Sequence, residues 1–388
     1  MADSDRMKLR LLGEWKETAF PNQDAQFSVP IDKQYKKNEY PTGVFLPYNT
    51  RNNILPTVDE LREQKVIKSG NFSSIRRAAE AHKQTRKFAQ SIIKPGLEFL
   101  EFVQKLEAKS KKLISAKGLK SGWGFPTGVS LNECAAHYTP NYGDPVMKFS
   151  QNSIVKVDFG VHVDGYIIDS AFSVAFDEKF DPLIQATKEA TAEGVKMAGI
   201  DQCIDDIGAS IEEIISSFEM EVGGKMVPIK PIENLSGHNI EPYRIHAKKS
   251  VPLVQTYNHE RMHENEIYAI ETFATTGSGT VVSAGTCSHY SLNYDMLRHQ
   301  LPGHSMASAR QLLREIHTKF GTLPFCRRWL DDFGMTKHLL PLKALVMANI
   351  ALDFPPLNDV YGSFTSQTEH TILLHKECKE VLSMSDDY

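Results

Sequence analysis

Apolar residues recur at helical spacing in two pairs of segments, and each pair is divided by a break. The breaks are Lys94-Pro95-Gly96 and Gly199-Ile200-Asp201. An apolar residue every three to four positions predicts an amphipathic helix, and proline or glycine is expected to end it. The chain is therefore predicted to contain two helix–break–helix units. Their helices are expected over residues 75–93, 97–113, 182–198 and 203–220.

The stretch IVKVDFGVHVDGYIIDSAF, residues 154–172, has the pattern of two strands instead. It is rich in β-branched residues, and Asp164-Gly165 at its centre is a typical hairpin turn. Asp158 and Asp169 nevertheless fall within the two apolar runs. A two-residue loop makes these aspartates diagonal neighbours, whereas a four-residue loop sets them directly opposite each other. Either register puts both carboxylates on one face, roughly 4.5 to 8 Å apart.

Two more acids occupy positions where an apolar residue is expected. The segment ENEIYAIETFATTGSG alternates as a strand, so that Glu271 shares a face with Ile267 and Ala269. Glu369 stands just ahead of the apolar run ILL near the end of the chain. A buried carboxylate normally becomes protonated, pairs with a cation or binds a metal ion.

The acids and one histidine together form a set of candidate metal ligands. The segment LSGHNIEPYRIHA places His238 and His246 eight residues apart. Two aspartates, two glutamates and one histidine suit two divalent ions of intermediate hardness, such as Mn, Fe, Co or Zn. The alternative is an exposed hairpin edge on which both aspartates are solvated.

The two helix–break–helix units also indicate a weak internal duplication. His137 lies 41 residues after Gly96, and His238 lies 39 residues after Gly199. Each unit is followed by strand patterns that carry acids. A duplication predicts two α+β halves related by a pseudo-twofold axis, with a site between them. Chance similarity is the alternative, because helix–break–helix is a common pattern.

Composition and charge are those of an ordinary globular protein. The 388 residues are 41% hydrophobic and 24% charged, with a net charge of -4. This balance argues against a protein whose main task is to bind nucleic acid or an acidic membrane. The first 20 residues contain no apolar signal-peptide core, and no run approaches the ~18 to 20 apolar residues of a membrane span. We therefore expect a cytoplasmic protein.

The cysteines are not arranged for metal binding or for a disulfide framework. Their number is five, and no two of them form a C-x-x-C pair. Neither a set of disulfides nor a thiolate zinc site is indicated.

Seven motifs, met in order along the chain, resemble those of the type 2 methionine aminopeptidases. The resemblance extends from about residue 73 to the final DDY. The motifs are FPTGVSLNECAAHYTP, VDFGVHVDGYIIDSAF, LSGHNIEPYRIHA, AIETFATTGSG, CSHY, FGTLPFCRRWLD and TEHTILL.

This resemblance implies the pita-bread fold, a pseudo-symmetric α+β domain with antiparallel sheet inside and helices outside. It divides the chain into an N-terminal extension over residues 1–72 and a catalytic domain over residues 73–388. A helical insertion over residues 290–353 lies within the catalytic domain and distinguishes type 2 from type 1 enzymes. The helical patterns of SARQLLREIHTKF and PLKALVMANIALD agree with such an insertion.

The resemblance also implies roles for individual residues. Glu271 is expected to act as acid and base, His246 to hydrogen-bond the oxyanion, and His137 to orient the substrate amide. Asp158 and Glu369 are expected to bridge, or nearly bridge, two divalent ions. The implied metal ligands are Asp158, Asp169, His238, Glu271 and Glu369.

The methionine side chain is expected in an apolar pocket, which suits a soft thioether. By resemblance, Phe125, Ile245 and His289 line this pocket. Phe354, in DFPPL, stands where the family more often has tyrosine, so that a hydrogen bond at the pocket rim is expected to be missing.

The implied activity is metal-dependent removal of the N-terminal methionine from nascent proteins and peptides, with a preference for a small second residue. Expected partners are peptides and nascent chains, a ribosome contact, and fumagillin-type epoxides. A proline-specific peptidase of the same fold is one alternative, and the insertion and the AAHYTP stretch argue against it. A non-catalytic relative that binds RNA or ribosomes is another, and the retention of all five ligand positions argues against it.

Overall fold

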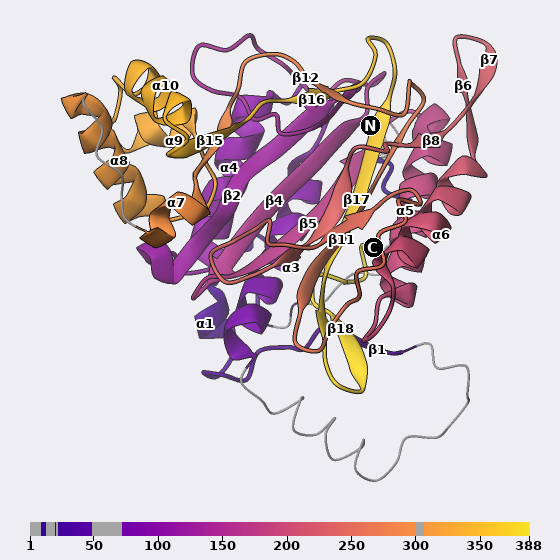
Figure 1. The fold of residues 1–388 in the computed structure, drawn as a ribbon, viewed down its shortest axis with the longest axis horizontal. Helices are drawn as coiled ribbons and strands as arrows, with labels where there is room; N and C mark the ends of the chain where they lie inside the picture. The colour runs from indigo at the N-terminus through magenta and orange to yellow at the C-terminus, as the bar shows by residue number, and fades with distance from the viewer. Residues whose placement is uncertain (1–8, 13–19, 21, 49–71, 300–305) are drawn as a thin grey trace, which may run out of the picture.

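Two β-sheets lie side by side at the centre of the molecule, and helices cover one face of them (Figure 1). The structure is a computed structural model, and it describes residues 9–12, 20, 22–48, 72–299 and 306–388. Helices α5 and α6 appear on the right of Figure 1, and the insertion helices α7 to α10 appear at the upper left. The expected α+β architecture with two helix-covered halves is confirmed.

The first sheet has the strand order β2–β4–β5 and contains the predicted hairpin. Strand β4 (Val155–Val163) pairs with β5 (Tyr166–Val174), and Val163 lies opposite Tyr166. The two-residue loop is therefore correct, and the four-residue alternative is wrong. The loop residues Asp164 and Gly165 both have positive φ, 52° and 85°, as a type I′ turn requires. Strand β2 (Ser121–Leu131) completes this sheet.

The second sheet has the strand order β1–β18–β17–β11–β9–β10, with β8 also paired to β11. Every pairing in it is antiparallel. Its strands are β1 (Val44–Pro47), β8 (Lys230–Pro231), β9 (Ser236–Ile240), β10 (Ser250–Pro252), β11 (Ile267–Thr275), β17 (Thr365–Leu374) and β18 (Cys378–Val381). Glu369 lies inside β17 and ahead of its apolar run ILL, as the sequence pattern predicts.

The two sheets meet along β5 and β17, where side-chain hydroxyls make the connecting hydrogen bonds. Thr371 Oγ1 accepts from the amide of Asp169 (2.9 Å), and Ser170 Oγ donates to the carbonyl of Glu369 (2.8 Å). Farther along, Ser173 Oγ donates to the carbonyl of Gln367 (2.9 Å). Among the described strands, β5 and β17 share no backbone ladder. We call this contact the seam.

The four predicted helices are present and each pair packs against one sheet, but the helix predicted over 203–220 ends at Ser216 and its last two predicted residues lie in β6 (Glu219–Val222). Helices α3 (Ser73–Ile92) and α4 (Phe99–Leu113) pack on the β2–β4–β5 sheet. Helices α5 (Asp181–Met197) and α6 (Ile204–Ser216) pack on the second sheet. Their apolar faces bury the two halves of the core, and each pair is divided at the predicted break.

Helices also dominate the segment over which the insertion is predicted. It begins in β13 (His289–Leu292) and returns in β15 (Ala351–Phe354), and these two strands pair with His289 opposite Phe354. Between them the helices build a separate apolar cluster around Trp329. The elements between the two strands are α7 (Tyr294–His299), α8 (Ala307–Phe320), β14 (Phe325–Cys326), α9 (Arg327–Asp332) and α10 (Leu339–Met347).

The described part of residues 1–72 packs on the rest of the chain. It contributes α1 (Ile31–Gln34) and β1, which forms the edge strand next to β18. The boundary at residue 72 remains a prediction. None of the helices described combines the length and the apolar character needed to cross a lipid bilayer.

The remaining elements are short. They are β3 (Cys134–Ala136), β6 (Glu219–Val222), β7 (Lys225–Pro228), β12 (Val282–Ser283), β16 (Leu357–Asn358) and the 3₁₀ turns Gly118–Lys120 and Glu178–Phe180.

A buried ion pair joins α3 to β18 and supports the β1 edge. Arg76 donates from Nε and Nη2 to the two carboxylate oxygens of Glu380 (2.9 and 2.8 Å), and the amide of Gly43 donates to the same carboxylate (2.7 Å). Burial alone would raise the pKa of Glu380, but hydrogen bonds with His375 and Arg76 outweigh it and lower the pKa to about 2. Glu380 therefore stabilises the fold above its ordinary pKa of 4.5, and this contribution is lost as the pH falls towards 2.

We predict that Glu380→Gln lowers the free energy of unfolding by about 3–5 kcal/mol, because it leaves the Arg76 guanidinium buried without its anion. It should also flatten the pH dependence of stability below pH 4.5. Urea unfolding at several pH values measures both effects. Glu98→Gln, which breaks the exposed ion pair with Lys148, is the control and should change stability by less than about 1 kcal/mol. Equal losses in the two variants would contradict the assignment.

Candidate metal centre

A cavity of about 220 Å³ opens where the two halves meet, and all eleven candidate residues from the sequence line it. The sequence positions of these residues span most of the chain, and the fold alone brings them together. They are Phe125, His137, Asp158, Asp169, His238, Ile245, His246, Glu271, His289, Phe354 and Glu369.

Strand register explains how the acids converge. Glu271 on β11 lies directly opposite Glu369 on β17, and His238 on β9 lies opposite Ala269, two residues from Glu271 on the same face. Asp158 lies on β4. Asp169, on β5, reaches the same point from across the seam. Backbone pairing within each sheet therefore fixes the ligands of that sheet relative to one another.

The distances are those of a ligand cluster. Asp169, His238 and Glu369 each offer one atom, and these three atoms lie within 4.8 Å of one another. The Nε2 atom of His238 is 3.6 Å from Asp169 Oδ2 and 3.6 Å from Glu271 Oε1. A cation between these three side chains would have both oxygen and nitrogen ligands.

The acids are crowded and poorly compensated. Burial raises the pKa of Asp158 to about 6. Burial also raises the pKa of Asp169 well above its usual range, and the charges of Asp158 and Glu271 add to this effect. The pKa of Glu369 rises for the same reasons. Four carboxyl groups in one buried site therefore resist ionisation unless a cation joins them.

Several polar atoms of the cluster have no hydrogen-bond partner within the described structure. They are Asp158 Oδ1, Asp169 Oδ1, both carboxylate oxygens of Glu369, Nδ1 of His238 and Oε1 of Gln367. Buried polar atoms are nearly always hydrogen-bonded, so orphaned atoms on adjacent ligands point to a missing partner. The residues present thus fit divalent metal ions, with an oxygen-rich set and one imidazole.

Gln367 belongs to the site and was missed by the sequence reasoning. Its amide Nε2 donates to Glu271 Oε2 (3.1 Å) and lies 3.4 Å from Asp158 Oδ2. An amide that holds two ligand carboxylates fixes their orientation. The available signal was its place on β17, two residues before Glu369 and therefore on the same face.

The histidines at the cavity differ in their surroundings. His246 is exposed to the cavity, and its ring stacks on that of His238 with centroids 4.1 Å apart. His137 has a φ of 66°, a left-handed conformation that is rare for residues other than glycine. Burial lowers the pKa of His137 to about 4, against an opposing hydrogen bond to the backbone of Pro355. His137 is therefore a neutral imidazole at neutral pH.

The aromatic wall of the cavity comes from the first half of the chain and from the two residues that flank the insertion. The ring centroids of His289 and Phe354 lie 6.0 and 5.9 Å, respectively, from the ring centroid of His137. Phe125 on β2 lies against Gly160, where a Cβ atom would come within 2.2 Å of the phenyl ring. The missing side chain at Gly160 is thus what lets Phe125 reach the cavity.

Comparisons with known proteins show the family of the chain. Residues 73–290 match the model of metallopeptidase family M24. Methionine aminopeptidase 2A of Arabidopsis thaliana is 46% identical over 364 residues, covering 93% of this chain and 81% of the relative. Methionine aminopeptidase 2 of Schizosaccharomyces pombe is 47% identical over 367 residues, covering 93% and 84% of the two chains.

Solved structures support the fold. The structure of a thermophilic Arx1 matches with a TM-score of 0.67 at 17% identity, covering 80% of this chain and 90% of that one. Methionine aminopeptidase from Thermotoga maritima matches with a TM-score of 0.53 at 20% identity, covering 81% and 98%. The pita-bread fold implied by the sequence is confirmed. With relatives this similar over almost its whole length, the chain belongs to the M24 metallopeptidases and, within them, to the type 2 methionine aminopeptidases.

Proposed function

We propose that the five ligand candidates hold two divalent metal ions and that this centre carries the activity of the protein. Family membership makes the chain a metallopeptidase that removes N-terminal methionine from peptides. The observation that supports the proposed site is the group of orphaned carboxylate oxygens at one cavity, which His238 faces with Nε2. The ligands are Asp158, Asp169, His238, Glu271 and Glu369.

The ions are of the type Mn, Fe, Co or Zn. When bound, such ions lower the pKa of water and polarise a carbonyl group. Use of a divalent metal follows from membership in the M24 metallopeptidases. Two ions, rather than one, are proposed because four acids converge on the site with one histidine.

The protein's own groups then move protons and orient the substrate. Glu271 accepts a proton from the attacking water and returns it to the leaving amine. His246, exposed at the cavity, donates a hydrogen bond to the oxyanion. His137, neutral and hydrogen-bonded to the backbone of Pro355 through one ring nitrogen, keeps the other nitrogen as an acceptor for the substrate amide N–H.

The methionine side chain is proposed to lie against Phe125, Ile245 and His289. Sulfur makes favourable contacts with aromatic rings, and the apolar walls favour an unbranched side chain. Phe354 closes the rim opposite His289 but has no hydroxyl group. The hydrogen bond that a tyrosine would supply at this rim is therefore absent.

Nascent chains are the proposed cellular substrate, and the cytoplasm is the proposed compartment. A ribosome contact stays a prediction, as does the absence of a specific nucleic-acid partner. The alternative of a proline-specific peptidase is disfavoured, because the relatives at 46% and 47% identity are methionine aminopeptidases. The same relatives argue against a non-catalytic protein.

We predict that Asp158→Asn and Asp169→Asn each abolish turnover and metal occupancy and leave the fold largely intact. In the unchanged protein, metal at about 100 times its Kd should add about 2.7 kcal/mol of stability, and both variants should lose this gain. Thermal melts with and without Co²⁺, together with elemental analysis, measure it. Asp205→Asn is the control, because Asp205 is a buried aspartate outside the cavity lining. Near-native activity of Asp169→Asn would refute the ligand assignment.

We predict that peptides beginning Met-Ala are cleaved efficiently, whereas Met-Lys peptides have a kcat/KM at least about tenfold lower, because a bulky second residue collides with the cavity rim. Met-Val should fall between them. Rates measured for the three peptides at equal metal loading test the specificity. Efficient cleavage of Met-Lys would count against the proposed pocket.

We predict that a fumagillin-type epoxide forms a covalent bond to His137. The free ring nitrogen attacks an epoxide carbon, the carbon–oxygen bond breaks, and the oxygen takes up a proton to become a hydroxyl group. Peptide mapping by mass spectrometry should place the adduct on His137. His137→Asn should lose the adduct and keep slower but measurable peptidase activity, because orientation is weakened while the metal ligands remain. An adduct on His246 or on a cysteine would overturn the assignment.

A further inference from the structure

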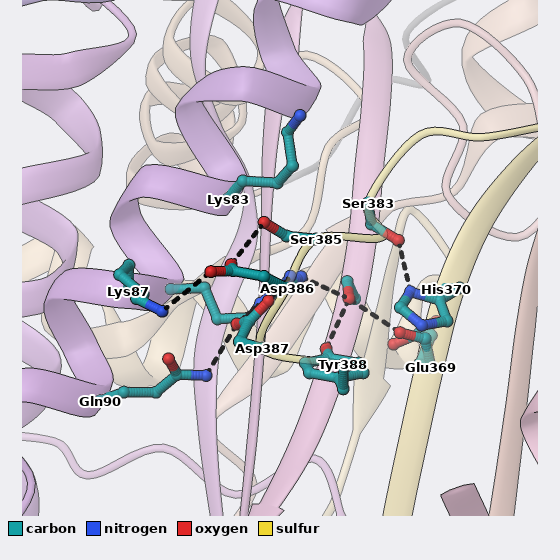
Figure 2. A network of polar contacts seen from close by, with 12 residues as sticks. Lys83, Lys87, Gln90, Glu369, His370, Ser383, Ser385, Asp386, Asp387 and Tyr388 are labelled. Atoms are coloured by element: carbon teal, nitrogen blue, oxygen red, sulfur yellow. Dashed lines mark hydrogen bonds and ion pairs between the residues drawn. The ribbon is translucent and has the colours of Figure 1, made fainter. Parts of the chain in front are cut away.

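Residues 383–388, which we call the tail segment, pack behind the two strands that meet at the seam (Figure 2). Successive residues of a strand point to opposite faces. Asp169 and Glu369 face the cavity, so their neighbours Ser170 and His370 face the tail segment. The tail segment thus lies on the far side of the candidate ligands.

Helix α3 fixes the tail segment in place. Arg86 donates from Nε and Nη2 to the two oxygens of Asp387, at 2.6 Å each, and both side chains are almost fully buried. Gln90 adds a third hydrogen bond to Asp387 (2.9 Å). The Arg86 guanidinium also lies 4.4 Å from the centre of the Tyr388 ring. Bidentate pairing of this kind fixes the relative orientation of the two side chains and also strengthens their interaction.

Tyr388 connects this anchor to the seam. Its hydroxyl group lies 2.8 Å from Ser170 Oγ and 2.9 Å from the carbonyl oxygen of Ala171. Ser170 Oγ in turn donates to the carbonyl of Glu369 (2.8 Å). The ring of Tyr388 stacks on His370, with centroids 4.8 Å apart. One hydroxyl group therefore contacts the strand that carries Asp169 and, through one serine, the backbone of Glu369.

A second contact of the tail segment reaches the same strand. Ser383 Oγ lies 2.9 Å from His370 Nδ1 and accepts from the amide of Thr371 (3.0 Å). Figure 2 shows Ser383 and Tyr388 on either side of His370, next to Glu369. The stretch of β17 that carries the ligand is thus held at three successive residues.

We propose that Tyr388 is a positioning residue for the metal centre. Among the described strands, only side-chain hydrogen bonds join β5 to β17 at the seam, so the spacing of Asp169 and Glu369 depends on hydroxyl groups. Metal ligation tolerates errors of only about 0.2 Å in ligand distance. Tyr388, at 2.8 Å, and more weakly Arg86 Nη1 of α3, at 3.4 Å, hold the central hydroxyl, Ser170. The inference rests on the proposed ligand set.

The test is a Co²⁺ titration of the metal-free full chain, followed by calorimetry and by the visible absorption of bound cobalt. Tyr388→Phe and Ser170→Ala should each weaken cobalt binding about tenfold and shift the absorption band. The double variant should bind cobalt about as tightly as each single variant, because both substitutions break the same chain of hydrogen bonds. Tyr48→Phe is the control, since its hydroxyl donates to the carbonyl of His375, away from the cavity.

Unchanged cobalt affinity and spectrum in Tyr388→Phe would overturn the proposal, as would an equal loss in Tyr48→Phe. A drop in the melting temperature of the metal-free protein without a change in cobalt binding would also overturn it, since a purely structural role predicts that result. Ser170→Ala removes one oxygen atom and gives the same measurement if Tyr388→Phe does not fold. If the proposed ligand set is wrong, the result can be told apart from failure of the Tyr388 proposal, because Asp169→Asn would then still bind cobalt.

Discussion

Electrostatic repulsion among four carboxylates, three buried and one half-buried, is the constraint around which this molecule is built. Glu271 and Glu369 face each other directly in adjacent antiparallel strands, an arrangement that is destabilising for like charges. Asp158 and Asp169 add two more acids from the other sheet. Bringing these acids together lowers the stability of the fold. The ions that we propose to bind there account for the arrangement. The rest of the core has to hold the acids close against their repulsion.

Two sets of contacts provide that restraint. Gln367 holds Glu271, with Asp158 at a longer distance, through one amide, and a neutral donor can do this without adding charge. Along the seam, Ser170 and Thr371 join the sheets through hydroxyl groups in place of a backbone ladder. A ladder would fix neighbouring strands about 4.8 Å apart, whereas hydroxyl bridges allow another spacing. The seam therefore suits a site in which ligands from two sheets must surround ions.

Local sequence signals were enough for the hairpin and the helices. The Asp164-Gly165 turn selected the hairpin, and the strand alternation that continues to Val163 and Tyr166 agrees with the two-residue loop that the structure contains. The helical stripes on either side of each break also gave the four main helices, because their periodicity is local. The face on which each acid lies followed from the same alternation.

Pairing between distant segments could not be read from periodicity. The opposition of Glu271 and Glu369 depends on the antiparallel register of β11 and β17, which are separated by the whole insertion. Alternation alone put Gln367 on the face of Glu369, but its contacts with Glu271 and Asp158 depend on how the strands pair. The roles proposed for the eleven cavity residues rested on the resemblance to a family, and the structure adds that one cavity joins them.

The paired strands β13 and β15 explain how a long helical insertion can lie beside this site. His289 and Phe354 flank the segment over which the insertion is predicted, and these two residues face each other across the pair. Because the entry and exit are closed by backbone hydrogen bonds, the insertion packs around its own cluster at Trp329. The insertion thus has an apolar cluster of its own, whereas the two residues that flank it form part of the cavity wall. The proposed methionine pocket and the insertion thus border each other at these two residues.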